Sequence, residues 1–359
     1  MSNSAQSFTI FKKVNQQEKL VFTKHISVML KAGLPVTEVL ETLASQTRSS
    51  YFKEVLTAVL SDVKNGKSLA DSFRKHPRWF DDFYISLIEI GETSGTLVDN
   101  LEFLVDQLVK SHSLKKKVRS ALIYPGLVLS LALVVGSFIS FFILPRLVDF
   151  FESFEIDLPF STKVLLFMGT TMRDYGIVIF LGLAGVLILT RFAIQLPRVK
   201  PYWHAVILKI PVIGELVSYS QLAQFSRNLG TLLQSGTPII KALEVTADTL
   251  SNIQFRRQLL SISSSLAKGK DVGRTMENIK FSKYPPLVSR MVAVGEKTGK
   301  LDETLLYLAV FYEDEVDDIS KNLGSVIEPV LLIAIGLFVG FLALSIISPI
   351  YELTGSIRR

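Results

Sequence analysis

The sequence predicts an all-α membrane protein that combines two homologous cytoplasmic helical bundles, of about six short helices each, with three transmembrane helices. Three observations lead to this fold class. The 359 residues are 48% hydrophobic and have a mean hydropathy of +0.38, which is high for a soluble protein and far from a disordered composition. Three apolar stretches are long enough to cross a bilayer. Two segments of about 100 residues repeat each other.

The N-terminal part predicts a short polar tail at 1–17, without a signal peptide, and a first helical domain at 18–119. Apolar residues recur at helical spacing and glycines punctuate the helices. We expect each glycine to end one helix in a left-handed conformation, and the following proline to open the next. These punctuating residues are Gly33, Pro35, Gly66, Gly91 and Gly95.

Three apolar stretches predict membrane spans at 120–145, 175–197 and 326–349. Each supplies the roughly 20 apolar residues that a helix needs to cross about 30 Å of hydrocarbon. Proline falls in the first turn of the first and third spans, where a missing N–H costs little. A second helical domain, at 198–325, separates the second span from the third.

The distribution of basic residues predicts the orientation of the spans, because cytoplasmic flanks are enriched in lysine and arginine. The loop at 146–174 carries more acidic than basic residues and is expected outside, as is the tail at 350–359. Both large helical domains are therefore expected in the cytoplasm. The basic residues that predict the orientation of the first span directly precede it: Lys115, Lys116 and Lys117.

The two helical domains are internal repeats. Phe22 corresponds to Phe225 at an offset of 203 residues, and one inserted residue later changes the offset to 204. The repeat includes the entry into a membrane span, because Pro125 corresponds to Pro329. The punctuating residues and one glutamate, Glu92, recur at these offsets, and their counterparts are Gly236, Pro238, Gly269, Gly295, Glu296 and Gly299.

In this duplicated pattern one span follows the first repeat, a second precedes the second repeat, and a third follows it. The pattern resembles the type II secretion F family over roughly residues 18–352. Its members are inner-membrane platform proteins of type IV pili, type II secretion systems and competence pseudopili. The resemblance implies a multi-pass protein of the bacterial inner membrane without catalytic activity. It also implies several partners: a hexameric secretion ATPase in the cytoplasm, pilin or pseudopilin subunits in the membrane, other alignment-complex proteins, membrane lipid, and further copies of the chain as a homo-oligomer.

Composition and motifs favour no enzyme and no cofactor. The absence of cysteine excludes a disulfide scaffold, a zinc–thiolate site, an iron–sulfur cluster and a cysteine nucleophile. The four histidines are widely separated and match no metal or catalytic spacing. The net charge is +6, from 39 basic and 33 acidic residues, but the basic residues are spread along the chain and do not favour direct nucleic-acid binding.

The duplicated Gly-Glu-x-x-Gly motif permits two interpretations. In the structural one it is a corner between two helices, where Ser94 or Thr298 caps the following helix and the glutamate accepts hydrogen bonds from nearby amides. In the functional one it is a contact patch for the ATPase or for a second protomer. Its retention in both copies favours the structural interpretation, since the two domains need not bind the same partner.

A second motif, Gly66-Lys67-Ser68, resembles the end of a phosphate-binding loop. The complete motif needs glycine where Ser61 stands, and it needs a preceding strand where this sequence predicts a helix. We therefore interpret Gly66 as the end of one helix and Ser68 as the start of the next. The energy for any mechanical work must then come from a partner.

Three charged features flank the spans. The lysines at 115–117 predict contact with anionic lipid, or alternatively a docking site for a partner. The acidic run from Glu313 to Asp318 predicts a solvated face, or a surface for a basic partner. Glu328, at the entry of the third span, is interpreted as an interfacial anchor, with a prepilin contact as the alternative.

Other functions stay open at this stage. A transporter would call for broken helices with polar groups at mid-membrane, and spans one and three instead carry small serine and glycine residues typical of helix packing. A passive membrane scaffold leaves the duplicated motifs unexplained. The sequence does not distinguish an adhesive pilus from a secretion or DNA-uptake pseudopilus.

Overall fold

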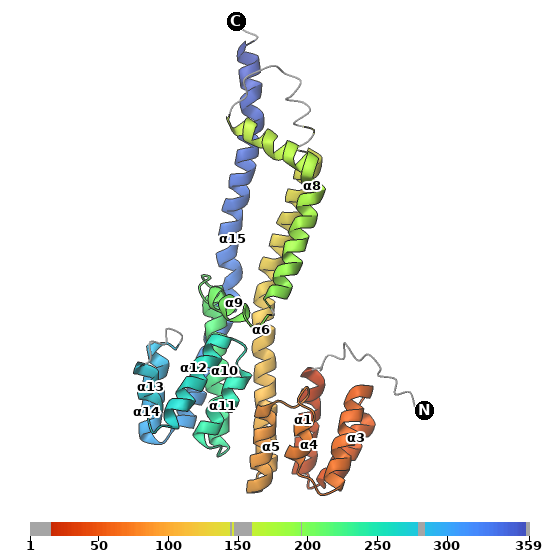
Figure 1. Cartoon of the computed structure of the whole chain (residues 1–359), viewed down its shortest axis with the longest axis vertical. Helices are drawn as coiled ribbons and strands as arrows, with labels where there is room; N and C mark the ends of the chain where they lie inside the picture. Colours follow the sequence, from red (N-terminus) through yellow and green to blue (C-terminus); the bar gives the residue numbers. More distant parts are fainter. Residues whose placement is uncertain (1–15, 144–145, 147–159, 195, 279–283, 357–359) are drawn as a thin grey trace. The chain divides into compact units, whose positions relative to one another are not determined.

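The computed structural model describes residues 16–143, 146, 160–194, 196–278 and 284–356, and at some helical positions only the backbone is described (Figure 1). The described residues form helices joined by short connections, and no strand occurs among them. The all-α prediction is therefore confirmed for this part of the chain.

The first repeat begins with five short helices and continues into a long one. Gly33 and Gly66 both have positive φ, of 85° and 83°, and Pro35 is the residue before the second helix, as the sequence predicts. Ser68 caps the fourth helix by accepting a hydrogen bond from the backbone N–H of Asp71 at 3.0 Å. The helices are α1 (Gln16–Lys31), α2 (Val36–Gln46), α3 (Ser50–Lys64), α4 (Leu69–Arg74), α5 (Asp82–Ser94) and α6 (Leu97–Phe138).

The second repeat reproduces this order. Gly236, Gly269 and Gly299 have φ values of 89°, 80° and 72°, and Pro238 precedes the helix that corresponds to α2. The same local chemistry thus ends and starts the same helices in both copies. The helices are α10 (Ile213–Gln234), α11 (Ile239–Thr249), α12 (Ile253–Leu266), α13 (Val272–Asn278), α14 (Pro286–Thr298) and α15 (Leu301–Ser356).

Gly91 corrects one expectation. It was predicted to interrupt a helix, but it lies inside α5. A Cβ atom at this position would lie 2.7 Å from Cα of Leu97 in the next helix. Gly295 has the same role in the second copy, where a Cβ would lie 3.0 Å from Cα of Leu301. Both glycines therefore serve a close approach of two helices, whereas Gly95, with φ of 74°, ends α5.

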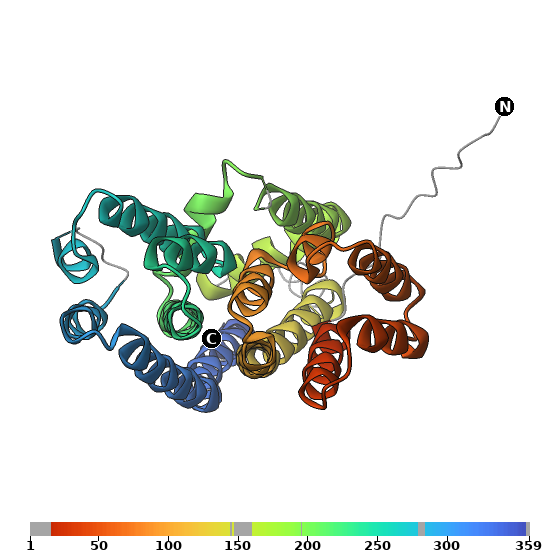
Figure 2. The same cartoon turned by 90° about the horizontal axis from the view of Figure 1, so that it is seen from below.

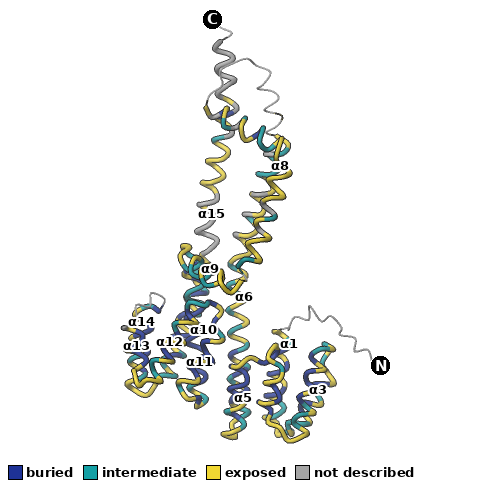
Figure 3. The backbone as a smooth tube through the Cα atoms, viewed as in Figure 1, coloured by how far each residue is buried: buried dark blue, intermediate teal, exposed yellow. Residues whose placement is uncertain are grey.

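The chain divides into two compact units, and the predicted repeats fall largely into one of them. That unit comprises 1–116 and 207–316, and the second comprises 117–206 and 317–359. Buried apolar residues of both repeats form one continuous cluster in the first unit, because α5 of the first repeat contacts α11 of the second. Figure 3 shows these buried positions concentrated on the short helices.

Aromatic residues fill the core of the first repeat. Phe22 meets Phe52 edge to face with ring centroids 5.4 Å apart, and Phe52 stacks on Trp79 at 3.9 Å. Such ring pairs contribute about 0.5–1.5 kcal/mol beyond the area that they bury. In the second repeat the counterparts Phe225 and Phe255 both contact Tyr284, at 5.3 and 5.5 Å.

The second unit contains the apolar segments. It is formed by the distal parts of α6 and α15, the π-helical turn η1 (Ile139–Ile143), α8 (Phe160–Ala193) and most of α9 (Lys200–Ile207). Thr162 donates a hydrogen bond to the carbonyl oxygen of Ser345 at 2.9 Å. Most of the described side chains on α8 are exposed in this chain (Figure 3).

Two described helices are long and apolar enough to cross a membrane, over residues 97–143 and 162–182, and a shorter apolar stretch covers 332–345. The expected boundaries at 119 and 325 lie inside the continuous helices α6 and α15. Residues 160–174, expected in the external loop, belong to α8. Its start was missed because Phe160-Ser161-Thr162 sits beside a proline and carries no apolar run of its own.

Candidate functional site

The Gly-Glu-x-x-Gly corner holds the start of another helix. Glu92 accepts two hydrogen bonds, from the backbone N–H of Leu69 to Oε1 at 2.6 Å and of Ala70 to Oε2 at 2.9 Å. These are the first two residues of α4. A carboxylate is stabilised there because the first N–H groups of a helix lack partners within it and carry partial positive charge.

The second copy repeats this clamp almost atom for atom. Glu296 accepts hydrogen bonds from Val272 N at 2.8 Å and Gly273 N at 2.9 Å, at the start of α13. The structural interpretation of the glutamate therefore holds in both copies. The prediction that Ser94 and Thr298 cap the following helix is wrong, because these hydroxyls donate to carbonyl oxygens of their own helices, Ile90 at 2.6 Å and Val294 at 2.9 Å.

The same clamp explains why Gly66-Lys67-Ser68 is not a phosphate loop. The residues that precede it form helix α3, and the N–H groups that a phosphate would need at the start of α4 already bind the Glu92 carboxylate. Lys67 instead pairs with Asp62 at 2.7 Å. Hydrogen bonds from Lys67 and Lys75 lower the pKa of the Asp62 carboxyl below its ordinary value.

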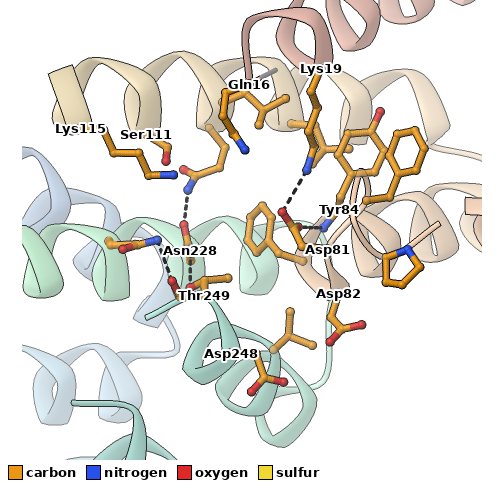
Figure 4. A pocket seen from close by; sticks show the side chains of 18 residues that line it. Gln16, Lys19, Asp81, Asp82, Tyr84, Ser111, Lys115, Asn228, Asp248 and Thr249 are labelled. Carbon is orange, nitrogen blue, oxygen red and sulfur yellow. Dashed lines mark hydrogen bonds and ion pairs between the residues drawn. The ribbon is translucent and has the colours of Figure 1, made fainter. Parts of the chain in front are cut away.

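A cleft of about 370 Å³ lies between the two repeats (Figure 4). Lys19 enters it with a side chain that is only 3% exposed, and its Nζ lies 2.9 Å from Oδ2 of Asp81. The same ammonium lies 4.9 Å from the centre of the Tyr84 ring, so a charge and a ring face together hold it. Asp81 also caps α5, since Oδ1 accepts a hydrogen bond from Tyr84 N at 3.0 Å.

The buried end of Tyr84 completes this cluster. Thr23 donates its hydroxyl to the carbonyl oxygen of Lys19 at 2.8 Å, so the Tyr84 hydroxyl, 3.2 Å away, is the donor to Thr23. Burial raises the pKa of Tyr84 well above its ordinary value. The cluster ties α1 to the start of α5, and its groups are engaged with one another.

Polar side chains join the two repeats across the cleft. Gln107 of α6 donates its Nε2 to Oδ1 of Asn228 of α10, and Asn228 donates to the hydroxyl of Thr249 at 2.6 Å. The Thr249 hydroxyl in turn donates to Thr246 O at 2.6 Å. This chain of bonds fixes the orientation of each amide, because the carbonyl of Thr246 only accepts. The junction between the repeats is therefore specific in register.

The lysines before the first span differ in their surroundings. Lys115 lines the cleft, Lys116 is exposed, and Lys117 pairs with Asp317 at 3.0 Å. Asp317 also pairs with Lys321 at 2.7 Å. Hydrogen bonds from Lys321 and, to a smaller extent, from Lys117 lower the pKa of the Asp317 carboxyl.

The acidic run is only partly a solvated face. Glu313 forms a two-pronged ion pair with Arg227, with Oε1 3.0 Å from Nε and Oε2 2.9 Å from the terminal NH2 nitrogen. Arg227 is nearly buried, so its charge requires this partner. Asp314 and Asp318 are exposed, in agreement with the expected solvated face. The run therefore divides into internal partners and exposed acids.

Comparison with known proteins then assigns the family. The family model for "Type II secretion system (T2SS), protein F" matches residues 22–145 and again residues 225–349. The chain belongs to the type II secretion F family. The two matched segments are the two repeats, and each includes the helix that continues toward an apolar stretch.

Relatives in this family match nearly the whole chain. The type IV pilus assembly protein PilC of Myxococcus xanthus is 34% identical, over 97% of this chain and 83% of that protein. The type IV pilus assembly protein TapC of Aeromonas hydrophila is 30% identical, over 95% and 82%. The type II secretion system protein F of Pseudomonas aeruginosa is 28% identical, over 98% and 86%. As a family member, the chain is a platform protein of a pilus or secretion machine.

The motif residues and the residues that form the polar contacts at the cleft are different sets. The motif residues Gly33, Gly66, Gly95 and Glu92 end or cap helices, as do their counterparts. Sequence reasoning did not single out Gln107 and Asn228, which join the repeats, or Lys19 and Asp81, which join α1 to α5 within the first repeat. The two copies differ at these positions as they do at most others, so the difference alone does not identify them. At the same offsets Lys19 corresponds to Leu222 and Gln107 to Phe311.

Two further predictions concern charge and metals. Glu328 lies within α15, but its side chain is outside the described residues. Among residues 16–143, 146, 160–194, 196–278 and 284–356, no group of three or more histidine, cysteine, aspartate or glutamate side chains could hold a metal ion.

Proposed function

We propose that this chain is the inner-membrane platform of a type IV pilus, where it couples a cytoplasmic hexameric ATPase to the insertion or extraction of pilin subunits. The observation that carries the proposal is the double match of the family model to two helical repeats. The energy source lies in the partner because the start of α4, where the phosphate-loop-like sequence stands, already binds Glu92.

The relatives favour a pilus over a secretion pseudopilus. The type IV pilus proteins PilC of Myxococcus xanthus and TapC match at 34% and 30% identity, and the secretion protein F of Pseudomonas aeruginosa matches at 28%. Type II secretion is the second candidate, since that relative also matches 98% of the chain.

The proposed topology has spans at 120–145, 175–197 and 326–349, with both repeats in the cytoplasm and the loop at 146–174 outside. Support comes from apolar side chains that stay exposed among the described residues, for example Leu127, Val134 and Ile177. Lipid is their natural environment, and pilin subunits can reach them by moving laterally in the membrane.

Single cysteines test this topology, because the chain contains none of its own. An impermeant maleimide added to intact spheroplasts should label Ser153→Cys in the external loop and spare Asn65→Cys at the end of α3. Both positions should be labelled after permeabilisation. Labelling of Asn65→Cys alone in intact spheroplasts would reverse the orientation.

The exposed part of the basic segment is proposed to rest on anionic lipid. Lys116 and Arg119 are exposed, whereas Lys117 is engaged with Asp317. Each exposed charge near an anionic bilayer contributes about 1 kcal/mol of attraction. The duplicated corner motifs are proposed as structural elements, since both glutamates already bind helix N-termini.

The function is tested by purifying the tagged chain from its native cells in mild detergent and identifying the proteins that accompany it by mass spectrometry. We expect a hexameric secretion ATPase and a pilin. The control is an unrelated tagged protein of the same membrane at the same abundance. A pseudopilin with secretion components would move the assignment to the second candidate. Recovery of neither an ATPase nor a pilin-like subunit would contradict both.

A further inference from the structure

The junction between the two repeats uses two different faces. The first repeat contributes the α5–α6 face, which includes Phe83 and Gln107. The second repeat contributes the α10–α11 face, which includes Gln224 and Asn228. Gln107 and Asn228 are only 7% and 1% exposed, and they are hydrogen-bonded to each other. Both faces line the cleft between the repeats (Figure 4).

Because the repeats correspond residue by residue, each face has a counterpart in the other copy. The counterpart of the α10–α11 face is the α1–α2 face of the first repeat, where an offset of 203 places Val21 at the position of Gln224 and His25 at that of Asn228. A groove of about 320 Å³ lies at this face and is lined by both residues, and by Gln46, which corresponds to the cleft residue Thr249.

No described residue covers the α1–α2 face. Val21 and Val28 are 46% and 58% exposed, and His25 is exposed, whereas the corresponding Asn228 is buried in the junction. Aliphatic side chains exposed beside one another on a helix face are typical of an interaction surface.

The counterpart of the α5–α6 face is the α14–α15 face of the second repeat. An offset of 204 places Leu287 at the position of Phe83 and Phe311 at that of Gln107. Phe83 is 5% exposed in the junction, but Leu287 is 46% exposed. Phe311 is 36% exposed and stands beside Tyr307 and Val310, which are exposed as well.

Each uncovered face has an apolar side chain at one position where the junction has an amide. The amides Gln224 and Gln107 are replaced by Val21 and Phe311. The groove is lined by one basic and one acidic side chain, Arg48 and Glu18, so its charge does not select a partner of one sign. The correspondence of the repeats and the exposed apolar side chains on both faces permit the α14–α15 face to occupy the α1–α2 groove.

We propose that the α1–α2 groove of one chain receives the α14–α15 face of a second copy, so that chains join head to tail in the way the two repeats join within a chain. In Figure 1, α3 of the first repeat and the α13–α14 pair of the second lie on opposite sides of the joined repeats, with α5 and α11 between them, and Figure 2 shows the same order from below. A contact between two different faces is heterologous, and it closes into a ring when its rotation closes. The proposal is independent of which machine the platform serves.

Cysteine pairs test the predicted register in the full-length chain in native membranes. His25 and Phe311 take the places of Asn228 and Gln107, whose side chains touch within the chain. Two tagged versions are co-expressed, one with His25→Cys and the other with Phe311→Cys. Because the original side chains meet at their tips, the two cysteines are joined with a short bismaleimide rather than by oxidation. We expect a cross-linked dimer that carries both tags. The variant with both substitutions in one chain should yield a ladder of higher oligomers.

Matched controls make the result decisive. Gln107→Cys with Asn228→Cys in one chain should form an intramolecular cross-link with the same bismaleimide, identified by mass spectrometry of the joined peptides, which verifies the chemistry at this spacing. Val21→Glu should reduce the mixed dimer at least tenfold, whereas Leu260→Glu, at a 38% exposed position on α12 outside both faces, should not.

Three outcomes would overturn the proposal. The first is no mixed dimer although the intramolecular control forms. The second is self-linkage of the His25→Cys chain, which would indicate a symmetric contact. The third is linkage of either cysteine to a different protein, such as the ATPase, which would assign the face to that partner.

Discussion

Removing the carboxylate of Glu92 should loosen α4 without disturbing the aromatic core. Glu92→Ala leaves the backbone N–H groups of Leu69 and Ala70 without their acceptor, while no core ring loses a contact. Because α4 has only six residues, it cannot compensate by propagating hydrogen bonds from a longer helix. Local opening of α4 is therefore the expected first effect.

The magnitude follows from the two hydrogen bonds. A bond to a charged group contributes about 1.5–3 kcal/mol when fully buried, and Glu92 is half-buried, so about 1 kcal/mol each is appropriate. The favourable charge at a helix N-terminus adds about 0.3–1 kcal/mol. We expect Glu92→Ala to lower the free energy of unfolding of the first repeat by about 2–3 kcal/mol. Glu92→Gln, which keeps one acceptor oxygen, should lose about half of that.

Tryptophan fluorescence during urea unfolding in detergent measures this change. The chain has two tryptophans, and a Trp203→Phe background leaves Trp79, which is buried against Phe52 in the first repeat. Amide hydrogen exchange of α4 provides a second readout. The matched control is Glu89→Ala, which removes only an exposed pair with Arg74 at 2.9 Å and should cost at most about 1 kcal/mol.

One result would refute the reasoning. If Glu92→Ala were no more destabilising than Glu89→Ala, and exchange in α4 were unchanged, the carboxylate would not hold this helix. The second copy supplies a replicate, because Glu296→Ala should raise exchange in α13 and leave α4 unaffected.

Three further changes probe the same fold. Gly91→Ala places a Cβ 2.7 Å from the Leu97 backbone. We expect the free energy of unfolding in the Trp79 urea assay to fall by about 2 kcal/mol, although alanine is the better helix former by about 1 kcal/mol. An unchanged midpoint would mean that the two helices can separate at no cost. Tyr284→Phe removes a buried hydroxyl that has no hydrogen-bond partner among the described residues. It should raise the free energy of unfolding by about 1 kcal/mol and with it the thermal midpoint. A lower midpoint would reveal a partner for the hydroxyl. Burial lowers the pKa of His76, so the unfolded state binds its proton first and stability should fall as the pH drops below about 6.5. His76→Gln should flatten that pH dependence, and an unchanged slope between pH 7 and 5 would contradict this assignment.

The helix ends were predictable because their chemistry is local. Gly33, Pro35 and Ser68 act on residues within one turn of themselves, and the structure confirms their positions at helix ends. Gly91 looks the same in sequence but acts on a neighbouring helix. Its role becomes visible only once α6 is known to cross α5 at that point.

The polar contacts at the cleft, both within the first repeat and between the repeats, were not predictable by the same means. Lys19 and Asp81 are 62 residues apart, and Gln107 and Asn228 are 121 apart. A lysine is expected at the surface until a specific partner is placed beside it. Helical periodicity assigns a face to the interior and does not identify which residue of another helix it meets.

Two groups of glycines in this chain should differ in mutational tolerance. The six with positive φ have no atom within 4 Å of a built Cβ, so only backbone strain opposes a side chain there. Asparagine, which adopts that conformation most easily after glycine, should be accepted at modest cost. Gly91 and Gly295 meet backbone at 3.0 Å or less, so asparagine should fare worse than alanine. In a deep mutational scan, the best-tolerated residue after glycine should therefore be asparagine at these helix ends and alanine at these helix crossings.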